Sequence, residues 1–349
     1  MSLLTISGLR KRFNLEAGFF ARYGRFVNAV NDVSFSIGKN ETYGLVGESG
    51  CGKTTTARLL VRMYEADGGT ILYYRDGATP GDGEGKPVDL ATLRRDELRQ
   101  YRQKVRYVFQ DPARSLNPRM CIREVLSSGL QYGTSRASSR QLREKAAAAL
   151  EEVGLFAADL ERRPAEFSGG QRQRISIARG LLPQPELLIC DEVVSALDVS
   201  IQAQILNLLL DIREKRTMSF LFIAHDLKVA CYFCDRIGVM YAGEIMEEAP
   251  AANLWRDGHQ PYIQMLFASA TGLNSQHLQS KDDASASDAA APGSPPPGVA
   301  VKPGVPETKS TDSCCAFAPR CPQATERCFV EKPLLAQITS DHILRCHLK

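Results

Sequence analysis

The chain has 349 residues, enough for one large domain or two, and its hydrophobic (44%) and charged (24%) fractions are ordinary for a globular protein. A formal net charge of only +3 gives no general reason to expect a nucleic-acid partner. No apolar run reaches the roughly 18 residues of a membrane span and the first residues do not resemble a signal peptide, so we expect any action at a membrane to pass through a partner subunit.

The first 46 residues predict three strands. Residues 3–13 alternate enough for a strand, 32–37 alternate like a half-buried strand, and 41–46 form an apolar run typical of a buried one. Residues 14–28 between the first two are expected to be a loop. Phe13 ends the first strand, where it is either a core residue or a platform on which an adenine ring stacks.

The next segment, residues 47–54, fits the pattern G-x-x-x-x-G-K-[ST] in full, and a helix is expected after it over 55–63. Glycines allow successive backbone N–H groups to face one point, and the helix N-terminus adds positive potential there. Lys53 is expected to reach the β- and γ-phosphates of a nucleotide, and the Thr54 hydroxyl to bind Mg²⁺. A chance glycine turn is the alternative, but the strand–loop–helix context favours a nucleotide.

Two further strands are expected over 69–75 and 105–109, separated by a glycine- and proline-rich surface loop and a charged helix. The second strand ends on Gln110. The loop that follows, 111–120, has prolines near both ends and many polar groups. It is either a long connector or a contact surface.

A helical pattern runs from Ile122 to about Leu155, and we expect a helical lobe, about residues 121–165, inserted in an α/β body. Another helix is predicted to follow, ending at Pro183. It opens with Ser168, Gly169, Gly170 and Gln171. This start is either a second anion site, by the same helix-dipole reasoning, or an ordinary capped helix.

Two carboxylates end the apolar run 187–190, which is typical of a parallel strand buried on both faces. Ligands of such sheets lie at the carboxyl edge of the strands, so Asp191 suits a Mg²⁺-bound water and Glu192 could polarise an attacking water. Asp198 precedes another predicted helix. A buried strand at 218–224 then brings His225 to the same edge, where it could sense a γ-phosphate, although a lone histidine is usually structural.

Strands at 237–240 and 243–247 and two short helices end the predicted globular domain at residue 271. Residues 272–312 contain mainly Ser, Ala, Asp, Pro and Gly, and we expect a flexible linker because they cannot bury enough apolar surface to offset chain entropy. Residues 313–349 are a small cysteine-rich region.

Taken in order, these motifs resemble the ATP-binding subunit of ATP-binding-cassette (ABC) transporters over about residues 3–270. Three segments indicate a narrower branch: the phosphate loop, the segment after Gln110, and Asp-Val-Ser-Ile-Gln-Ala-Gln at 198–204. Their amino-acid sequences resemble the dipeptide/oligopeptide importer branch, which also includes nickel importers. The resemblance implies an α/β fold: a P-loop nucleotide-binding domain with an inserted helical lobe and an antiparallel β subdomain.

The resemblance also implies roles for particular residues. Phe13 would stack on adenine, and the phosphates would be held by Gly47, Glu48, Ser49, Gly50, Cys51, Gly52, Lys53, Thr54 and Thr55. Mg²⁺ would be bound through Thr54, Gln110 and Asp191. Glu192 would be the catalytic base, with His225 on the γ-phosphate. Asp198 would lie in the D-loop, and Ser168, Gly169, Gly170 and Gln171 would act on the ATP of a facing subunit.

The partners implied are a second ATP-binding subunit, expected to be a paralogue, two membrane permeases and, indirectly, a substrate-binding protein. The loop after Gln110 would meet a permease, and the protein would lie peripherally on the cytoplasmic face of the inner membrane. The expected function is ATP hydrolysis that powers import of di- or oligopeptides. Nickel or another small solute is the alternative cargo, and a non-transport ABC ATPase is the alternative class.

Ten cysteines are present, and five of them lie between Cys314 and Cys346. Without a secretion signal, a metal site is expected rather than a disulfide framework. The cysteine motif of the tail also resembles this branch, which implies a [4Fe–4S] cluster on Cys315, Cys321, Cys328 and Cys346, with zinc or free thiols as alternatives. Cys314 stands where the branch usually has glycine, so either Cys314 or Cys315 is the first ligand. Val193 departs from the family, which usually has proline after the catalytic glutamate.

Overall fold

The computed structural model describes residues 2–14, 26–74, 87–129, 138–195, 197–257, 260–271 and 313–348. An eight-stranded sheet lies at its centre, in the order β11-β12-β10-β9-β3-β8-β7-β6. Its strands are β3 (Thr42–Val46), β6 (Val105–Val108), β7 (Leu187–Asp191), β8 (Ser219–Ala224), β9 (Arg236–Tyr241), β10 (Glu244–Pro250), β11 (Leu335–Thr339) and β12 (His342–Arg345). Strands β6, β7, β8, β3 and β9 are parallel. Every residue of β3, β7 and β8 is buried, as expected for parallel strands covered on both faces.

The antiparallel subdomain is a separate four-stranded sheet in the order β2-β1-β4-β5. Its strands are β1 (Ser2–Asn14), β2 (Phe26–Gly38), β4 (Gly68–Tyr73) and β5 (Val88–Asp89). The loop predicted over residues 14–28 is shorter in the structure. Strand β1 extends to Asn14 and β2 begins at Phe26, because these two residues pair in the antiparallel ladder. The middle of that predicted loop, 15–25, lies outside the described residues.

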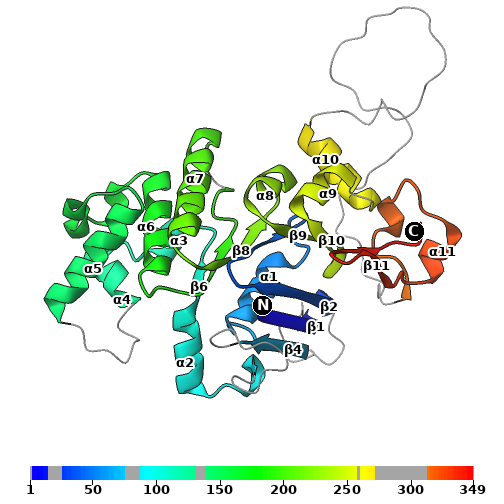
Figure 1. The fold of residues 1–349 in the computed structure, drawn as a ribbon, viewed down its shortest axis with the longest axis horizontal. Coiled ribbons are helices and arrows are strands. Elements are labelled where there is room, and N and C mark those ends of the chain that lie inside the picture. Colours follow the sequence, from blue (N-terminus) through cyan, green and yellow to red (C-terminus); the bar gives the residue numbers. More distant parts are fainter. Residues whose placement is uncertain are drawn as a thin grey trace, which may run out of the picture.

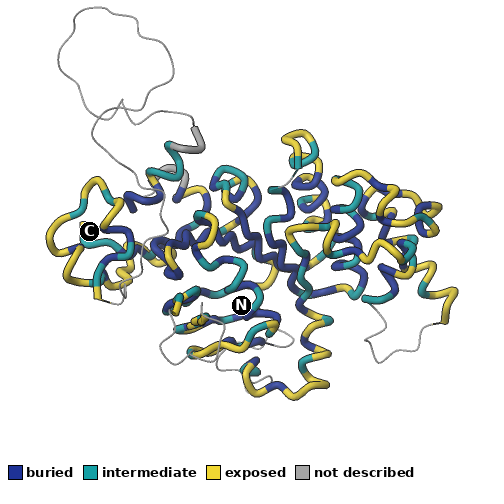
Figure 2. The backbone as a smooth tube through the Cα atoms, turned by 180° about the vertical axis from the view of Figure 1, so that it is seen from behind, coloured by how far each residue is buried: buried dark blue, intermediate teal, exposed yellow. Residues whose placement is uncertain are grey.

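Helices flank the central sheet, and several of them lie between residues 112 and 181. They are α1 (Lys53–Leu60), α2 (Arg95–Lys104), α3 (Pro112–Ser115), α4 (Ile122–Ser128), α5 (Ser139–Glu152), α6 (Gly169–Leu181), α7 (Val199–Lys215), α8 (Leu227–Phe233), α9 (Ala251–Asp257), α10 (Pro261–Thr271) and α11 (Glu326–Val330). Short 3-10 turns are η3 (Leu90–Thr92), η4 (Ala157–Glu161), η5 (Pro164–Glu166) and η7 (Ala318–Arg320). Helices α4 and α5 lie beside α6 at one end of the molecule, and the C-terminal elements lie at the other (Figure 1). Buried backbone runs through the middle of the molecule, along the central sheet (Figure 2).

The segment after Gln110, expected to be a loop, contains the short helix α3. The Asp111 carboxylate caps it by accepting from the backbone N–H groups of Ala113 and Arg114, and Pro112 occupies the first turn. Proline is favoured at this position because its missing N–H has no partner there in any helix. The segment is therefore ordered by its own caps.

The cysteine-rich region continues the central sheet, which the sequence did not predict. Strand β12 pairs antiparallel with β10, with Leu344 opposite Glu247, and β11 then pairs with β12. Leu344 is fully buried, and His342 lies 2.7 Å from the Glu247 carboxylate through its Nε2. The predicted linker, 272–312, lies outside the described residues.

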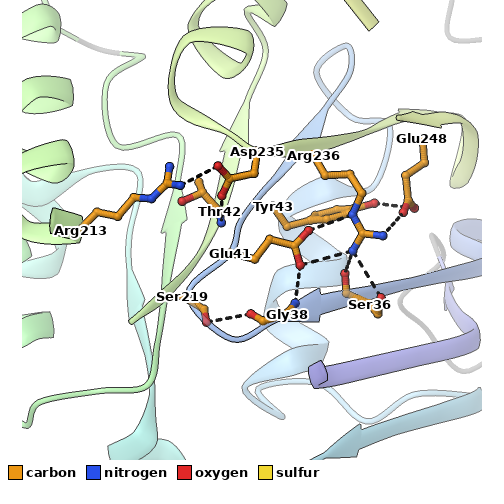
Figure 3. Close-up of polar contacts among 10 residues, drawn as sticks. All are labelled: Ser36, Gly38, Glu41, Thr42, Tyr43, Arg213, Ser219, Asp235, Arg236 and Glu248. Atoms are coloured by element: carbon orange, nitrogen blue, oxygen red, sulfur yellow. Dashed lines mark hydrogen bonds and ion pairs between the residues drawn. The ribbon is translucent and has the colours of Figure 1, made fainter. Parts of the chain in front are cut away.

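A polar network ties together the ends of the strands that lie away from the phosphate loop (Figure 3). The Arg236 guanidinium donates to Glu41 and forms ion pairs with Glu41 and Glu248, each 2.9 Å long. The Tyr43 hydroxyl donates to Glu248 at 2.9 Å. These bonds join β3, β9 and β10 at the edge opposite the phosphate loop.

Candidate active site

The phosphate loop between β3 and α1 has a backbone that requires glycine at two positions. Gly47 has φ 155° and Gly52 has φ 109°. A Cβ at Gly47 would lie 2.1 Å from the carbonyl oxygen of Met240, and one at Gly52 would lie 2.1 Å from that of Ala29. Both the left-handed conformation and the close backbone approach therefore exclude larger residues.

Lys53 lies inside the curve of this loop. Its side chain is 3% exposed, and its ammonium group donates to the carbonyl oxygens of Gly47 at 2.6 Å and Glu48 at 2.8 Å. Ser49 and Gly50 are exposed at the tip of the loop, and Thr55 is half-buried. Burial raises the pKa of the Cys51 thiol, which lies 3.7 Å from the Lys53 ammonium. The loop thus surrounds one buried cation, as a phosphate cradle requires.

The register of the parallel strands brings the other predicted residues to the same edge. Val46 of β3 lies beside Ala224 of β8, and Asp191 of β7 lies beside Ile223. His225 follows Ala224 directly and is exposed. Because the carboxyl ends of parallel strands meet at one edge, the phosphate loop, Asp191 and His225 share it.

Asp191 is buried, 1% exposed, and both of its carboxylate oxygens accept a hydrogen bond. The Thr54 hydroxyl donates to Oδ1 at 3.0 Å, and the Tyr107 hydroxyl donates to Oδ2 at 2.5 Å. Burial, and then the Asp191 charge, raise the pKa of Tyr107 well above its ordinary value, so this hydroxyl stays a donor. The first helical turn is in this way joined to the end of β7.

Glu192 adopts an unusual backbone for a non-glycine residue, with φ 48°. Its N–H donates to Ile223 at 3.1 Å, and its carbonyl accepts from the Ser195 hydroxyl at 2.9 Å. Its carboxylate accepts from the Gln110 amide at 2.6 Å. A residue in this conformation costs about 1–3 kcal/mol, and such strain is concentrated at functional sites.

The structure does not bring all the predicted residues together. Ser168 is the N-cap of α6 and forms a capping box with Gln171, so this helix start is an exposed, well-capped one. Helix α6 lies apart from α1, with strands of the central sheet between them (Figure 1). A Cβ on Gly170 would lie 2.7 Å from the Ile201 side chain, whereas Gly169 is more open. Asp198 is the N-cap of α7 and is exposed.

Phe13 is half-buried near the end of β1. Its ring meets Tyr64 edge to face, with centroids 5.3 Å apart, and the Lys11 ammonium lies 5.6 Å from the ring. Both the core role and the stacking role expected of this ring are compatible with these contacts.

Two residues that contact the site have no role predicted by the sequence pattern. Tyr107 lies within a predicted strand and donates to Asp191, and the guanidinium of Arg320 binds Glu48 of the phosphate loop. Strand alternation could have indicated Tyr107, because it pairs with Ile189 and therefore lies on the same face of the sheet as Asp191. No local pattern could have indicated Arg320, because it is 272 positions from Glu48 along the chain.

The cysteines form no disulfide in the described part of the chain, where every cysteine is free. No group of three or more His, Cys, Asp or Glu side chains in those ranges is arranged to hold a metal ion. Burial, followed by the neighbouring Cys328 and Cys346 thiols, raises the pKa of Cys315 to about 11. Burial likewise raises the pKa of Cys321, with smaller contributions from Cys346 and Cys328.

No helix among the residues described is both long and apolar enough to cross a membrane.

Comparison with known proteins places the chain in a family. Residues 30–195 match the ABC transporter family, and residues 246–328 match the C-terminal region of oligopeptide/dipeptide transporters. The chain is 39% identical over 348 residues to a probable peptide ABC transporter ATP-binding protein, y4tS, of Sinorhizobium fredii, covering 100% of this chain and 90% of that protein. It is 37% identical over 349 residues to the oligopeptide transport ATP-binding protein AppF of Bacillus subtilis, covering 99% and 97%.

Solved structures agree with this placement. The dimeric, post-hydrolysis structure of the ATP-binding cassette MJ0796 bound to ADP and Pi matches with a TM-score of 0.59 and 25% identity, over 71% of this chain and 98% of that one. The structure of cbiO1 from Clostridium perfringens has the same fold, with a TM-score of 0.60 at 22% identity over 74% and 92%. The chain therefore belongs to the ABC family of ATPases, as an ATP-binding subunit of the oligopeptide and dipeptide transporter type.

Proposed function

We propose that this protein hydrolyses ATP to power the import of di- or oligopeptides across a membrane. The observation that supports it most is the convergence, at one edge of a parallel sheet, of a phosphate loop around Lys53 with the hydrogen-bonded carboxylates of Asp191 and Glu192. The peptide cargo is supported by the names of the full-length relatives and by the C-terminal region at 246–328. Nickel or another small solute is the alternative cargo, and no relative named above favours it.

In this proposal the loop 47–55 holds the phosphates, and Phe13 stacks on the adenine. Thr54, Gln110 and Asp191 would hold the Mg²⁺ that accompanies the nucleotide. Hard oxygen donors of this kind suit Mg²⁺, which keeps several waters and binds phosphate oxygens as well. Glu192 activates the attacking water, and His225 contacts the γ-phosphate.

A second ATP-binding subunit completes the site. The exposed start of α6, Ser168 to Gln171, is capped by its own side chains and lies apart from the phosphate loop of its own chain. Such a helix start with Ser, Gly and Gly exposes N–H groups that suit a phosphate of a facing subunit. Asp198, at the start of α7, belongs to the same facing surface. We infer that the partner is a paralogue of this chain.

A permease would dock beside the loop after Gln110. A hollow of about 370 Å³ is lined by Met120, the last residue of this segment, and by residues of α4 and α5: Arg123, Glu124, Ser127, Ser139, Leu142 and Arg143. Arg123 and Arg143 both form ion pairs with Glu161, at 3.5 Å and 3.4 Å. A mixed polar hollow at the end of this segment, beside Met120, suits a helix from a membrane subunit. Two permeases, which would receive the peptide from a substrate-binding protein, would hold the ATPase on the cytoplasmic face of the inner membrane.

A [4Fe–4S] cluster on Cys315, Cys321, Cys328 and Cys346 is a separate proposal. The support for it is that Cys315 and Cys328 lie next to each other in the fold, since the N–H of Cys315 donates to the carbonyl oxygen of Cys328 at 2.9 Å. The absence, among the described residues, of any group of three or more His, Cys, Asp or Glu side chains arranged to hold a metal ion counts against it. Absorbance near 400 nm with bound iron in anaerobically purified protein is the expected result, and iron-free, colourless protein would eliminate the cluster.

The ATPase proposal is tested with Glu192→Gln. We expect this variant to bind MgATP and to lose at least about a hundredfold in turnover, since a general base contributes typically 10²–10⁴-fold. Glu214→Gln, an exposed position on α7, is the matched control and should keep normal turnover. Hydrolysis should rise when the cognate permeases and a peptide-loaded binding protein are added in proteoliposomes. Unchanged hydrolysis in Glu192→Gln would remove this residue as the base, and stimulation by nickel alone would replace the peptide cargo.

A further inference from the structure

The cysteine-rich region contacts the phosphate loop directly through an ion pair. The Arg320 guanidinium donates to both carboxylate oxygens of Glu48, at 2.7 Å and 2.8 Å. Two parallel bonds between an arginine and a carboxylate fix orientation as well as charge. Arg320 ends the 3-10 turn η7, in the C-terminal elements that lie beside α9 and α10 (Figure 1).

Two aromatic rings, those of Tyr241 and Phe317, lie against this arginine. Its guanidinium lies 5.7 Å from the Tyr241 ring centre and 6.0 Å from that of Phe317. Phe317 is fully buried and packs on Tyr241 and Tyr262, with ring centres 5.3 Å apart in both pairs. The position of Arg320 is therefore set by a packed cluster that joins β9, α10 and the C-terminal region.

The backbone of Glu48 is held from the same side. Its N–H donates to the Tyr262 hydroxyl at 2.9 Å, while its carbonyl accepts from Lys53. Both the side chain and the main chain of one phosphate-loop residue are thus bonded to elements that follow residue 260. The other residues of the loop tip, Ser49 and Gly50, are exposed.

The charge of Glu48 explains why this contact matters for function. The loop gathers N–H dipoles and Lys53 to bind an anion, whereas an unpaired carboxylate there would repel phosphates. Arg320 neutralises that carboxylate and fixes its orientation through two hydrogen bonds. Without the arginine, the same carboxylate would oppose nucleotide binding.

We propose that Arg320 is a positioning residue of the phosphate loop, through which the C-terminal region raises the affinity of the protein for MgATP. This inference rests on the proposed nucleotide site. The two side chains are 44% and 37% exposed, so solvent screens the pair and the effect is moderate. Because coupling between two sites is reciprocal, bound nucleotide also stabilises the docked C-terminal region by the same factor.

The test measures the dissociation constant of a fluorescent ATP analogue with Mg²⁺ on full-length variants. We expect Arg320→Ala to weaken binding by about threefold to tenfold, the size of one partly screened unit charge near the site. The double variant Glu48→Gln/Arg320→Ala should bind within about twofold of wild type, because it no longer has the unpaired carboxylate. A role of Arg320 in packing alone would not be rescued in this way.

Arg327→Ala is the matched control, since Arg327 makes a similar two-bond pair with Glu331 in the same region without touching the phosphate loop. It should bind the nucleotide like wild type, and a melting curve for each variant shows that it is folded. The loss in Arg320→Ala should shrink as salt is raised from 50 mM to 500 mM, because screening acts on an exposed charge.

The possible outcomes separate the two proposals. Wild-type affinity in Arg320→Ala, or a double variant as weak as Arg320→Ala, overturns the inference while leaving the nucleotide site intact. Failure of the wild-type protein to bind MgATP, or binding that survives Lys53→Ala unchanged, overturns the nucleotide site itself.

Discussion

Replacing Tyr107 with phenylalanine tests how the buried carboxylate of Asp191 is held. Asp191 is 1% exposed, and its only two bonds among the described residues come from the hydroxyls of Tyr107, at 2.5 Å, and Thr54, at 3.0 Å. The substitution keeps the ring and removes the hydroxyl. One oxygen of a buried carboxylate then loses its donor while the packing stays the same.

The magnitude follows from the charge of the acceptor. A hydrogen bond to a charged group contributes about 1.5–3 kcal/mol, and leaving a buried acceptor unpaired costs about as much. Tyr107 is half-buried, so water can approach the freed oxygen in part. We therefore expect a loss of ~2 kcal/mol in the free energy of unfolding, which is about 4 °C in Tm for a chain of this size.

Tyr101→Phe provides the comparison. The Tyr101 hydroxyl is buried and donates to the neutral carbonyl oxygen of Leu60 at 2.7 Å, so its removal should cost only ~1 kcal/mol. Differential scanning calorimetry of both variants, with and without MgATP, measures the difference. If Tyr107→Phe loses no more stability than Tyr101→Phe, the carboxylate is held by Thr54 alone and the reasoning is wrong.

Three further predictions concern other parts of the chain. Gly47→Ala should abolish nucleotide binding, because the new Cβ would lie 2.1 Å from the Met240 carbonyl oxygen. Gly50 also has a positive φ, 82°, but a Cβ there would have nothing within 4 Å, so Gly50→Ala should bind less than about tenfold more weakly in the same titration. Val193→Pro should change ATP turnover by less than tenfold, since valine can adopt the φ of proline; a rise of tenfold or more would contradict this view. In metal-free protein the pKa of Cys315 is about 11, so this thiol should react with iodoacetamide at pH 8 about a hundredfold more slowly than free cysteine. The free energy of unfolding should also fall between about pH 9 and 11, because the thiol releases its proton at a lower pH in the unfolded chain than in the folded one. Alkylation at the rate of free cysteine would refute this prediction.

The part of the fold that the sequence predicts is the part determined by local pattern. Strands β7 and β8 are continuous apolar runs, and both turned out to be buried parallel strands next to one another. Strand β12 was missed because its pairing with β10 depends on a partner about a hundred residues away. Its Leu344 becomes a core residue only when that partner is in place.

The candidate site divides along the same line. Residues that belong to a contiguous motif, such as Lys53 and Thr54, could be named from the sequence because strand, loop and helix specify their geometry locally. The hydrogen bond from Gln110 to Glu192 follows from the parallel pairing of β6 with β7, which no local sequence pattern indicates. Tyr107 and Arg320 enter the site only through tertiary packing, and their residue types give no signal on their own.

The phosphate loop also depends on later parts of the chain. The carbonyl of Cys51 accepts from the N–H of Gly243, in the turn between β9 and β10, at 2.9 Å. Since β10 pairs with β12, the cysteine-rich region reaches the loop by two routes, through this turn and through the pair of Arg320 with Glu48. The phosphate loop has exposed tip residues and three glycines with positive φ, Gly47, Gly50 and Gly52. Its conformation therefore depends on contacts with the surrounding strands and with the C-terminal region. A substitution in the C-terminal region should for this reason change the nucleotide affinity before it changes other properties of the site.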